Sequence, residues 1–169
     1  IHPIAYSRAR AAGIWQCRHV TGKRYGVQQT WGYDGRRDVL AATRAALDYL
    51  EKLHEEFDDW QLALAAYNWG ENGVSRAIAH NRAKRKPTRY ENLTMPRETR
   101  NYLPKLQAVR NIISNPSSLS FPLEDIPNRP YFTPVSTPEH IDRQVAAQLA
   151  AITRDAFRSL NPGTTLPAL

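Results

Sequence analysis

A chain of 169 residues, 41% apolar and 23% charged, has the composition of a globular protein with one main domain and room for a small appendage. Lys and Arg outnumber Asp and Glu by 23 to 16, and the net charge of +7 favours a polyanionic partner: nucleic acid, an anionic membrane surface or an acidic wall polymer. The single cysteine, Cys17, excludes an intramolecular disulfide. We find neither a signal peptide nor an apolar run long enough to cross a membrane.

The first part of the chain, residues 1–115, is predicted to be mainly helical. It is interrupted by a packed loop at 21–37, which holds four glycines: Gly22, Gly26, Gly32 and Gly35. Asp38 is the expected N-cap of the next helix, because apolar residues recur after it at helical spacing as far as Phe57.

Either Asp58 or Asp59 is expected to cap a further short helix, and Asn72-Gly73 is predicted to break the chain after it. The last helix of this region is expected to begin near Pro96, whose fixed backbone angle suits a first turn, and to end at Asn115. Its expected buried stripe comprises Tyr102, Leu106, Val109 and Ile113.

Residues 116–135 are predicted to form an extended proline-rich linker, and residues 136–169 a small helical unit. The aromatic pair Tyr131-Phe132 is costly to leave in water, so we expect it to pack on other residues. Ser136 opens a sequence with the spacing of a capping box, and Thr153 is the expected cap of a second helix. A turn is predicted at 161–163. One apolar face is expected from Ile141, Val145, Leu149 and Ile152.

The run from Leu62 to Gly73 is the strongest candidate for chemistry. It opens with small and apolar residues and then places Tyr67, Asn68 and Glu71 beside two glycines. A tyrosine and an adjacent amide at a helix exit can donate to hydroxyl, N-acetyl or developing-charge oxygens. From these residues alone two interpretations stay open: the floor of a polar cleft, or a tyrosine that anchors the core beside an asparagine that caps the helix.

Six segments along the first 115 residues form an ordered set of motifs: Pro3, Ala5, Ser7 and Gly13–Gln16; Thr21-Gly22 and Tyr25-Gly26; Asp34–Asp38; Thr43–Leu50; Leu64–Gly70, which contains an Ala-Tyr-Asn signature; and Glu98–Lys105. In this order they resemble the lytic transglycosylase catalytic domain. The run around Trp15 and the run at 33–38 are typical of a membrane-bound branch of that family. The C-terminal unit resembles a partial LysM module, of the kind that binds N-acetylglucosamine chains.

The resemblance implies a mainly α chain: a lysozyme-like domain at 1–115, the linker at 116–135 and a partial LysM-like unit at 136–169. It implies an enzyme of cell-wall turnover that cleaves the β-1,4 bond between N-acetylmuramic acid and N-acetylglucosamine and forms a 1,6-anhydro ring. It implies no cofactor and no metal. By the same resemblance Tyr67 supports the catalytic carboxyl group, and the expected substrate-binding residues are Ser7, Gln16, Asn68 and Glu71.

One departure from the family pattern concerns the catalytic acid. The family uses a single glutamate as general acid and base, and by the motif's spacing it would lie about three residues before Ile1. We therefore expect sequence upstream of Ile1, and we expect this chain alone to be inactive. Asp34 and Asp38 are not replacements, because neighbouring arginines lower a carboxyl pKa, which is the wrong direction for a general acid. Glu71 is expected to make loop hydrogen bonds.

The partner implied by the resemblance is the peptidoglycan glycan strand, bound by a monomer in the periplasm, with the full-length protein anchored at the outer membrane. The basic run at 81–89 is expected to be a solvated loop face, with an anionic membrane surface or acidic peptide stems as its attractants. No nucleic acid is expected as a partner. Two other classes stay open: a non-catalytic module that binds peptidoglycan or chitooligosaccharides, and a nucleic-acid-binding helical protein suggested by charge alone.

Overall fold

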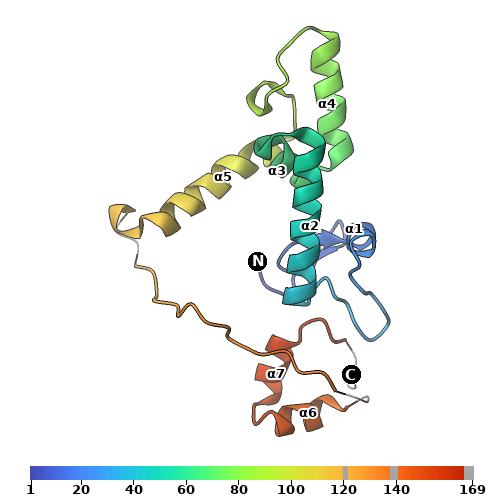
Figure 1. Cartoon of the computed structure of the whole chain (residues 1–169), viewed down its shortest axis with the longest axis vertical. Helices are drawn as coiled ribbons and strands as arrows, with labels where there is room; N and C mark the ends of the chain where they lie inside the picture. The colour runs from blue at the N-terminus through green and yellow to red at the C-terminus, as the bar shows by residue number, and fades with distance from the viewer. Residues whose placement is uncertain (120–121, 138–140, 166–169) are drawn as a thin grey trace. The chain divides into compact units, whose positions relative to one another are not determined.

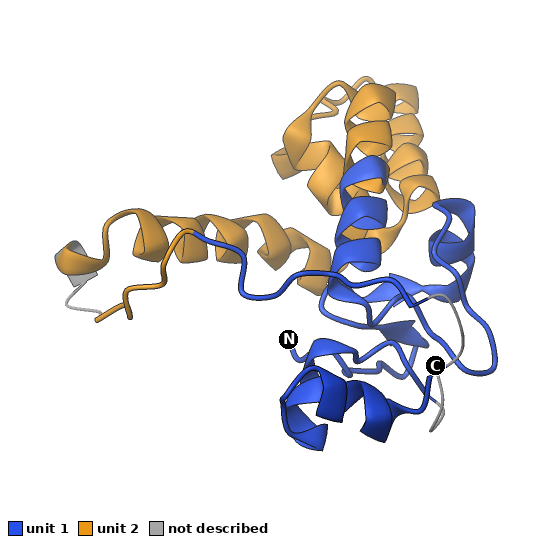
Figure 2. Ribbon diagram, turned by 60° about the horizontal axis from the view of Figure 1, so that its bottom comes forward, with its two compact units in different colours: residues 1–48, 129–169 blue, residues 49–128 orange. Residues whose placement is uncertain are grey.

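The computed structural model describes residues 1–119, 122–137 and 141–165 (Figure 1). These described residues form seven α-helices, two short strands and two 3₁₀ helices, so the prediction of a mainly α chain is confirmed. Contacts within the chain divide it into two compact units (Figure 2). Unit 1 comprises Ile1–Asp48 with Arg129–Leu169, and unit 2 comprises Tyr49–Asn128.

The N-terminal residues of unit 1 form a small hairpin instead of the predicted helix. Strand β1 (Ala11–Ala12) pairs antiparallel with strand β2 (Cys17–Arg18). Between the strands, Gly13 and Gln16 have φ angles of +77° and +49°, which a right-handed helix cannot contain. Helix α1 (His19–Arg24) follows and occupies the start of the segment predicted as a loop, so that prediction was wrong over its first residues.

A buried guanidinium group fixes the loop after α1. Arg36 is only 7% exposed, and it donates to Asp34 through Nε to Oδ1 at 2.9 Å and through Nη2 to Oδ2 at 2.8 Å. Its Nη1 donates to the Arg10 carbonyl at 2.8 Å, which ties the loop to the hairpin. Gly13 permits this approach, because a Cβ there would lie 1.9 Å from the Arg36 carbonyl oxygen. The buried charge is therefore paired and hydrogen-bonded, as burial requires.

Helices α6 (Arg143–Leu149) and α7 (Arg154–Leu160) belong to the C-terminal part of unit 1. Thr153 caps α7, as predicted, by accepting a backbone N–H at 3.1 Å. Asp142 caps α6 by accepting two backbone N–H groups. The capping box expected at 136–139 extends into residues outside the described part of the chain.

Two packing predictions for the C-terminal segment were wrong in part. Of the aromatic pair that was expected to pack, Tyr131 is 91% exposed, whereas Phe132 is half-buried. Val145 and Leu149, two members of the expected apolar face, are exposed as well, whereas Ala147 and Phe157 are buried. The other two members of that face, Ile141 and Ile152, are half-buried. Two helices of seven residues each cover only part of each other's surface, so Val145 and Leu149 stay exposed.

The turn predicted at 161–163 is confirmed, because the Thr164 N–H donates back to the Asn161 carbonyl at 3.2 Å. The chain at this turn also pairs with the loop that holds the buried guanidinium: the Asp34 N–H donates to the Gly163 carbonyl at 2.7 Å. Asp34 therefore holds the arginine with its side chain and the C-terminal segment with its backbone.

Unit 2 is a helical array around α3. Helix α2 (Val39–Phe57) begins in unit 1, and its residues from Tyr49 onward belong to unit 2. Two predicted caps are confirmed, since Asp38 in unit 1 accepts a backbone N–H at the start of α2 and Asp59 accepts two at the start of α3. The last long helix ends at Ser114, with Asn115 as the C-cap, as predicted. The other elements of unit 2 are α3 (Trp60–Trp69), α4 (Glu71–Ala83), η1 (Tyr90–Asn92), α5 (Arg97–Ser114) and η2 (Pro116–Leu119).

The chain breaks at Gly70 and not at Asn72-Gly73, so the predicted position of this break was wrong. Gly70 has a φ of +95°, a conformation that favours glycine, and it alone separates α3 from α4. Asn72 and Gly73 lie in the first turn of α4. Gly73 serves packing there, because a Cβ at this position would lie 2.7 Å from the ring of Trp69.

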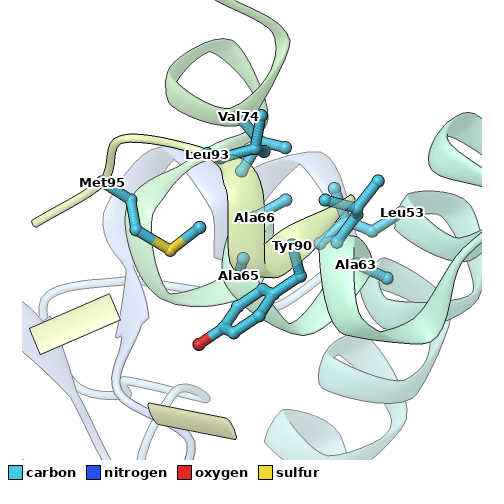
Figure 3. Packing of buried hydrophobic residues seen from close by; sticks show 9 residues of the cluster. Leu53, Ala63, Ala65, Ala66, Val74, Tyr90, Leu93 and Met95 are labelled. Atoms are coloured by element: carbon cyan, nitrogen blue, oxygen red, sulfur yellow. The ribbon is translucent and has the colours of Figure 1, made fainter. Parts of the chain in front are cut away.

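The core of unit 2 surrounds α3, whose buried face is made largely of alanines (Figure 3). These short side chains let the larger residues of neighbouring elements pack directly against the helix. The buried cluster comprises Leu53, Leu62, Ala63, Ala65, Ala66, Val74, Tyr90, Leu93 and Met95.

The buried stripe predicted along α5 was wrong. Leu106, Val109 and Ile113 are 45%, 51% and 62% exposed, although they recur at helical spacing. Leu103, which lies beside that stripe, packs against the core cluster instead. Helical spacing identifies an apolar face but does not say whether another element of the chain covers it.

We expect Gly13→Ala to lower the free energy of unfolding of the chain by at least about 3 kcal/mol, because a Cβ there meets backbone that cannot move aside. Gly26→Ala is the matched control: its φ is +73°, but nothing lies within 4 Å of its Cβ position, so only the backbone strain of about 1–2 kcal/mol remains. Urea denaturation of both variants measures the difference. Equal losses would show that the close approach to Arg36 contributes nothing.

Candidate functional site

Tyr67 and Glu71 lie on either side of the Gly70 turn between α3 and α4. The ring of Tyr67 packs against the core cluster, and its centroid lies 5.6 Å from that of Tyr49, with the rings tilted by 41°. The Tyr49 hydroxyl donates to Glu71 Oε2 at 3.3 Å, and Lys52 Nζ lies 3.8 Å from the same oxygen. Tyr49 thus brings two predicted site residues together. Lys52 also pairs with Glu56, so one cation is shared between the Glu56 and Glu71 carboxylates.

The side-chain amide of Asn68 joins the end of α3 to the first turn of α5. Its Oδ1 accepts from Thr99 Oγ1 at 2.8 Å, and its Nδ2 donates to Glu98 Oε1 at 3.3 Å. Thr99 is 1% exposed, so this hydrogen bond is shielded from water. Both ends of the amide are therefore engaged, and its orientation is determined by its partners. One N–H and one lone pair of Asn68 are left for a ligand.

The interpretation of Asn68 as a helix cap was wrong. Asn68 lies within α3, and the C-cap is Gly70, whose N–H donates to the Ala66 carbonyl at 2.7 Å. Glycine takes this position because its φ of +95° strains any side chain. The alternative for Tyr67, a core anchor, agrees with the packing of its ring, while its hydroxyl can still take part in chemistry.

Ser7 and Gln16, the two predicted site residues of unit 1, hold the turns of the N-terminal hairpin. Ser7 Oγ accepts from the Ala11 N–H at 3.0 Å, and Gln16 Nε2 donates to the Gly13 carbonyl at 2.8 Å. Both side chains are half-buried. The Ser7 hydroxyl keeps its own proton to donate, and Gln16 keeps its Oε1 as an acceptor.

The carboxylates of the loop in unit 1 have structural work, as expected. Burial raises the pKa of the Asp34 carboxyl, but the hydrogen bonds and charge of Arg36, together with the charge of Arg37, outweigh burial and hold that pKa below its usual value. Asp38 caps α2, and burial together with this carboxylate raises the pKa of Tyr33 to about 12. An ionised, paired Asp34 is a poor proton donor near neutral pH.

Thiol reactivity and metal binding depend on the surroundings of Cys17 and on the spacing of the His, Cys, Asp and Glu side chains. Burial raises the pKa of the Cys17 thiol, although Arg36 partly opposes it, so this side chain stays protonated at neutral pH. In the described ranges no three His, Cys, Asp or Glu side chains gather as a metal site would require. None of the helices described has the length and apolarity to cross a membrane.

Residues from distant segments surround the predicted site residues. Tyr49 and Lys52 reach Glu71 from α2, and Thr99 reaches Asn68 from α5. Tyr49 and Thr99 lie in segments that match the family, but the sequence did not predict these contacts. Their separations in sequence, 22 residues for Tyr49 and 31 for Thr99, carry no local signal. One signal in the sequence was Thr99, a polar residue near the start of a predicted helix. If such a hydroxyl is buried, it needs a hydrogen-bond partner from another element.

Comparison with known proteins finds the family described as Transglycosylase SLT domain over residues 1–89. Membrane-bound lytic murein transglycosylase D of Escherichia coli strain K12 is 39% identical over 162 residues, which cover 95% of this chain and 36% of that protein. The putative tributyltin chloride resistance protein of Alteromonas sp. strain M-1 is 48% identical over 84 residues, which cover 49% of this chain and 41% of that protein. The chain thus spans 36–41% of the length of these curated relatives.

Stability should depend on pH through Asp34. Because its pKa is lower in the folded than in the unfolded chain, its contribution is present above the unfolded value of 3.8 and is lost as the pH falls through the folded value. Asp34→Asn should remove this part of the acid dependence and cost about 2–3 kcal/mol at pH 7, since it leaves the Arg36 charge unpaired.

Urea denaturation between pH 7 and pH 2 measures both effects. Asp125→Asn is the control, because this carboxylate is exposed to solvent in the extended segment and its replacement should leave the curve unchanged. If Asp34→Asn and the unmodified chain lose stability in parallel as the pH falls, the pairing does not set the acid dependence.

Proposed function

The chain belongs to the transglycosylase SLT domain family, and on this premise we propose that it is part of a peptidoglycan lytic transglycosylase. The proposed reaction cleaves the β-1,4 bond between N-acetylmuramic acid and N-acetylglucosamine and forms 1,6-anhydro-N-acetylmuramic acid, in cell-wall turnover. The observation that carries the proposal is the end of α3, where Tyr67 and Asn68 occupy the positions of the family signature on a rigid, packed helix. A substrate-binding group gains precision from such support.

The general acid and base in this proposal is a glutamate expected just upstream of Ile1. Its carboxyl group protonates the leaving glycosidic oxygen and then takes the proton from the C6 hydroxyl of the muramic sugar. That hydroxyl attacks C1 and closes the anhydro ring, so no water is consumed and no second carboxylate is needed. A mechanism with a single carboxylate does not require Asp34 or Asp38. Asp34 binds Arg36 in the loop, and Asp38 caps α2. The route differs from that of two-carboxylate glycosidases.

The proposed supporting residue is Tyr67, whose hydroxyl would hydrogen-bond the catalytic carboxyl group or the muramic sugar. In unit 2, Asn68 would offer its remaining N–H to substrate, and Glu71 would accept from sugar hydroxyls, with Lys52 nearby. In unit 1, the proposed substrate-binding groups are the Ser7 hydroxyl and the Gln16 amide oxygen. No cofactor takes part in this scheme.

We place the protein in the periplasm, where peptidoglycan lies, as a monomer with outer-membrane anchoring of the full-length form. The name of the Escherichia coli relative, a membrane-bound murein transglycosylase, supports this placement. The basic run at 81–89 is the proposed contact for an anionic membrane surface. Asn81 supports that run, since its buried amide donates to the Pro87 carbonyl at 2.8 Å and to the Asn92 carbonyl at 2.9 Å. We also propose that residues 116–135 form a linker and that residues 136–169 form a LysM-like unit.

The chain alone should bind purified sacculi and release no 1,6-anhydromuropeptides. Binding is expected from the subsites, and release is not, because the proposed acid lies outside these residues. Co-sedimentation with sacculi and chromatography of the supernatant measure the two properties separately. Release by the chain alone would refute the assignment of the acid, and failure to bind would refute the subsites. Extending the chain upstream to include the glutamate should restore release.

In the full-length protein, Tyr67→Phe should lower kcat by roughly tenfold to a hundredfold, as expected when one hydrogen bond to the reacting groups is lost. The thermal unfolding midpoint should change little, since the ring that packs on the core is kept. Tyr102→Phe serves as the control, because it removes a half-buried tyrosine hydroxyl from the same unit. Equal losses of stability and turnover in Tyr67→Phe would favour the core anchor instead.

A further inference from the structure

Helices α6 and α7 belong to the C-terminal part of unit 1 (Figure 1). A hollow of about 380 Å³ is lined by residues of these two helices. Its volume falls in the range of small-ligand sites. Its walls come from the first residues of α6 and from one face of α7. The lining residues are Asp142, Arg143, Gln144, Arg154, Phe157 and Arg158.

The charges around this hollow do not balance. Three guanidinium groups and one carboxylate, Asp142, line it, so the cations exceed the anions by two. Asp142 also caps α6, where its Oδ1 accepts from the Gln144 N–H at 2.7 Å and from the Val145 N–H at 3.4 Å. No ion pair within the described ranges involves Arg154 or Arg158. Cations gathered at one site repel each other unless an anion lies between them.

Two of the arginines are held by neutral partners that leave their charge unopposed. Arg143 donates through Nη1 to Thr164 Oγ1 at 3.4 Å, and Arg154 donates through Nη2 to Gln144 Oε1. These bonds orient the guanidinium groups but use only one of the five N–H donors of each. The remaining donors suit a bidentate contact with a carboxylate or phosphate.

Phe157 gives the hollow an apolar side. It is buried between the helices while the arginines beside it on α7, at positions 154 and 158, are exposed. A charged group that binds beside this ring is partly shielded from water, which strengthens its attraction to the guanidinium groups. The alkyl part of the same ligand would lie against the ring. An apolar wall under a cationic rim fits a small organic anion better than a neutral sugar.

We propose that the hollow between α6 and α7 binds the carboxylates of a short acidic peptide, with Arg143, Arg154 and Arg158 as donors and Phe157 as the apolar wall. Peptide stems of peptidoglycan are the source of such carboxylates, and this identification of the source rests on the proposed function. A unit that binds stems would sense the peptides that the glycan strand carries rather than the sugar alone.

The test is a titration of the chain with a synthetic muropeptide stem that has free carboxylates, followed by amide chemical shifts of α6 and α7. The same stem with every carboxylate amidated, inorganic phosphate and chitotetraose are the comparison ligands. The free stem should shift the α6 and α7 resonances and saturate, whereas the amidated stem and chitotetraose should not. A response to phosphate with none to the stem would overturn the carboxylate assignment.

Arg154→Gln/Arg158→Gln should weaken stem binding roughly tenfold or more, because charged hydrogen bonds are lost. Lys105→Gln/Arg110→Gln on α5 is the matched control: it removes the same two charges from another exposed helix and should leave stem binding within about twofold. Equal weakening in both double variants would overturn the site in favour of general charge attraction. Thermal unfolding of each variant shows whether it is folded.

Sacculus binding separates this proposal from the proposed function. Retained sacculus binding without stem binding overturns the hollow as a carboxylate site and leaves the peptidoglycan assignment standing. Stem binding by a chain that does not bind sacculi overturns the proposed function and leaves the hollow as a carboxylate site of unidentified source.

Discussion

The short side chains of α3 are the constraint on which unit 2 depends. Ala63, Ala65 and Ala66 have no side-chain freedom to lose on burial, and they leave room for residues from α4, α5 and η1 to reach the helix directly. A larger residue at any of these positions would displace several elements at once, since each alanine is at most 1% exposed. The last turn of the same helix carries Tyr67 and Asn68, so the alanine face that builds the core also sets where the signature residues lie.

Unit 1 is organised differently, around a charge. The Arg36 guanidinium joins the loop, the hairpin and, through Asp34, the C-terminal segment. Removing one partner of such an ion pair destabilises the fold, because the other partner is left as an unpaired charge that is buried or half-buried. This pairing limits the chemistry available to the loop. Because Arg36 lowers the pKa of Asp34, the Asp34 carboxylate stays ionised near neutral pH and cannot act as a proton donor.

Features with local causes could be predicted from the sequence, and features with distant causes could not. The caps at Asp38, Asp59 and Thr153 follow from a side chain and the backbone two or three residues away, and all three are confirmed. The break at Gly70 was misplaced because Asn72-Gly73 is the stronger turn dipeptide, whereas Gly73 is small to make room for Trp69. The stripe on α5 was read correctly as apolar and wrongly as buried. At the candidate site, Tyr67, Asn68 and Glu71 were named from their motif, but their partners Tyr49 and Thr99 come from helices far away in sequence.

The double engagement of Asn68 bears on how the Ala-Tyr-Asn signature is used as a marker. An aspartate at this position would face the Glu98 carboxylate without a proton to donate, and one of the two acids would have to become neutral. An alanine would leave the buried Thr99 hydroxyl without its acceptor. The joint between α3 and α5 therefore selects asparagine on structural grounds alone. A relative without catalytic activity would still need this asparagine to join the two helices. The presence of the asparagine in a sequence therefore indicates the fold and does not by itself indicate activity.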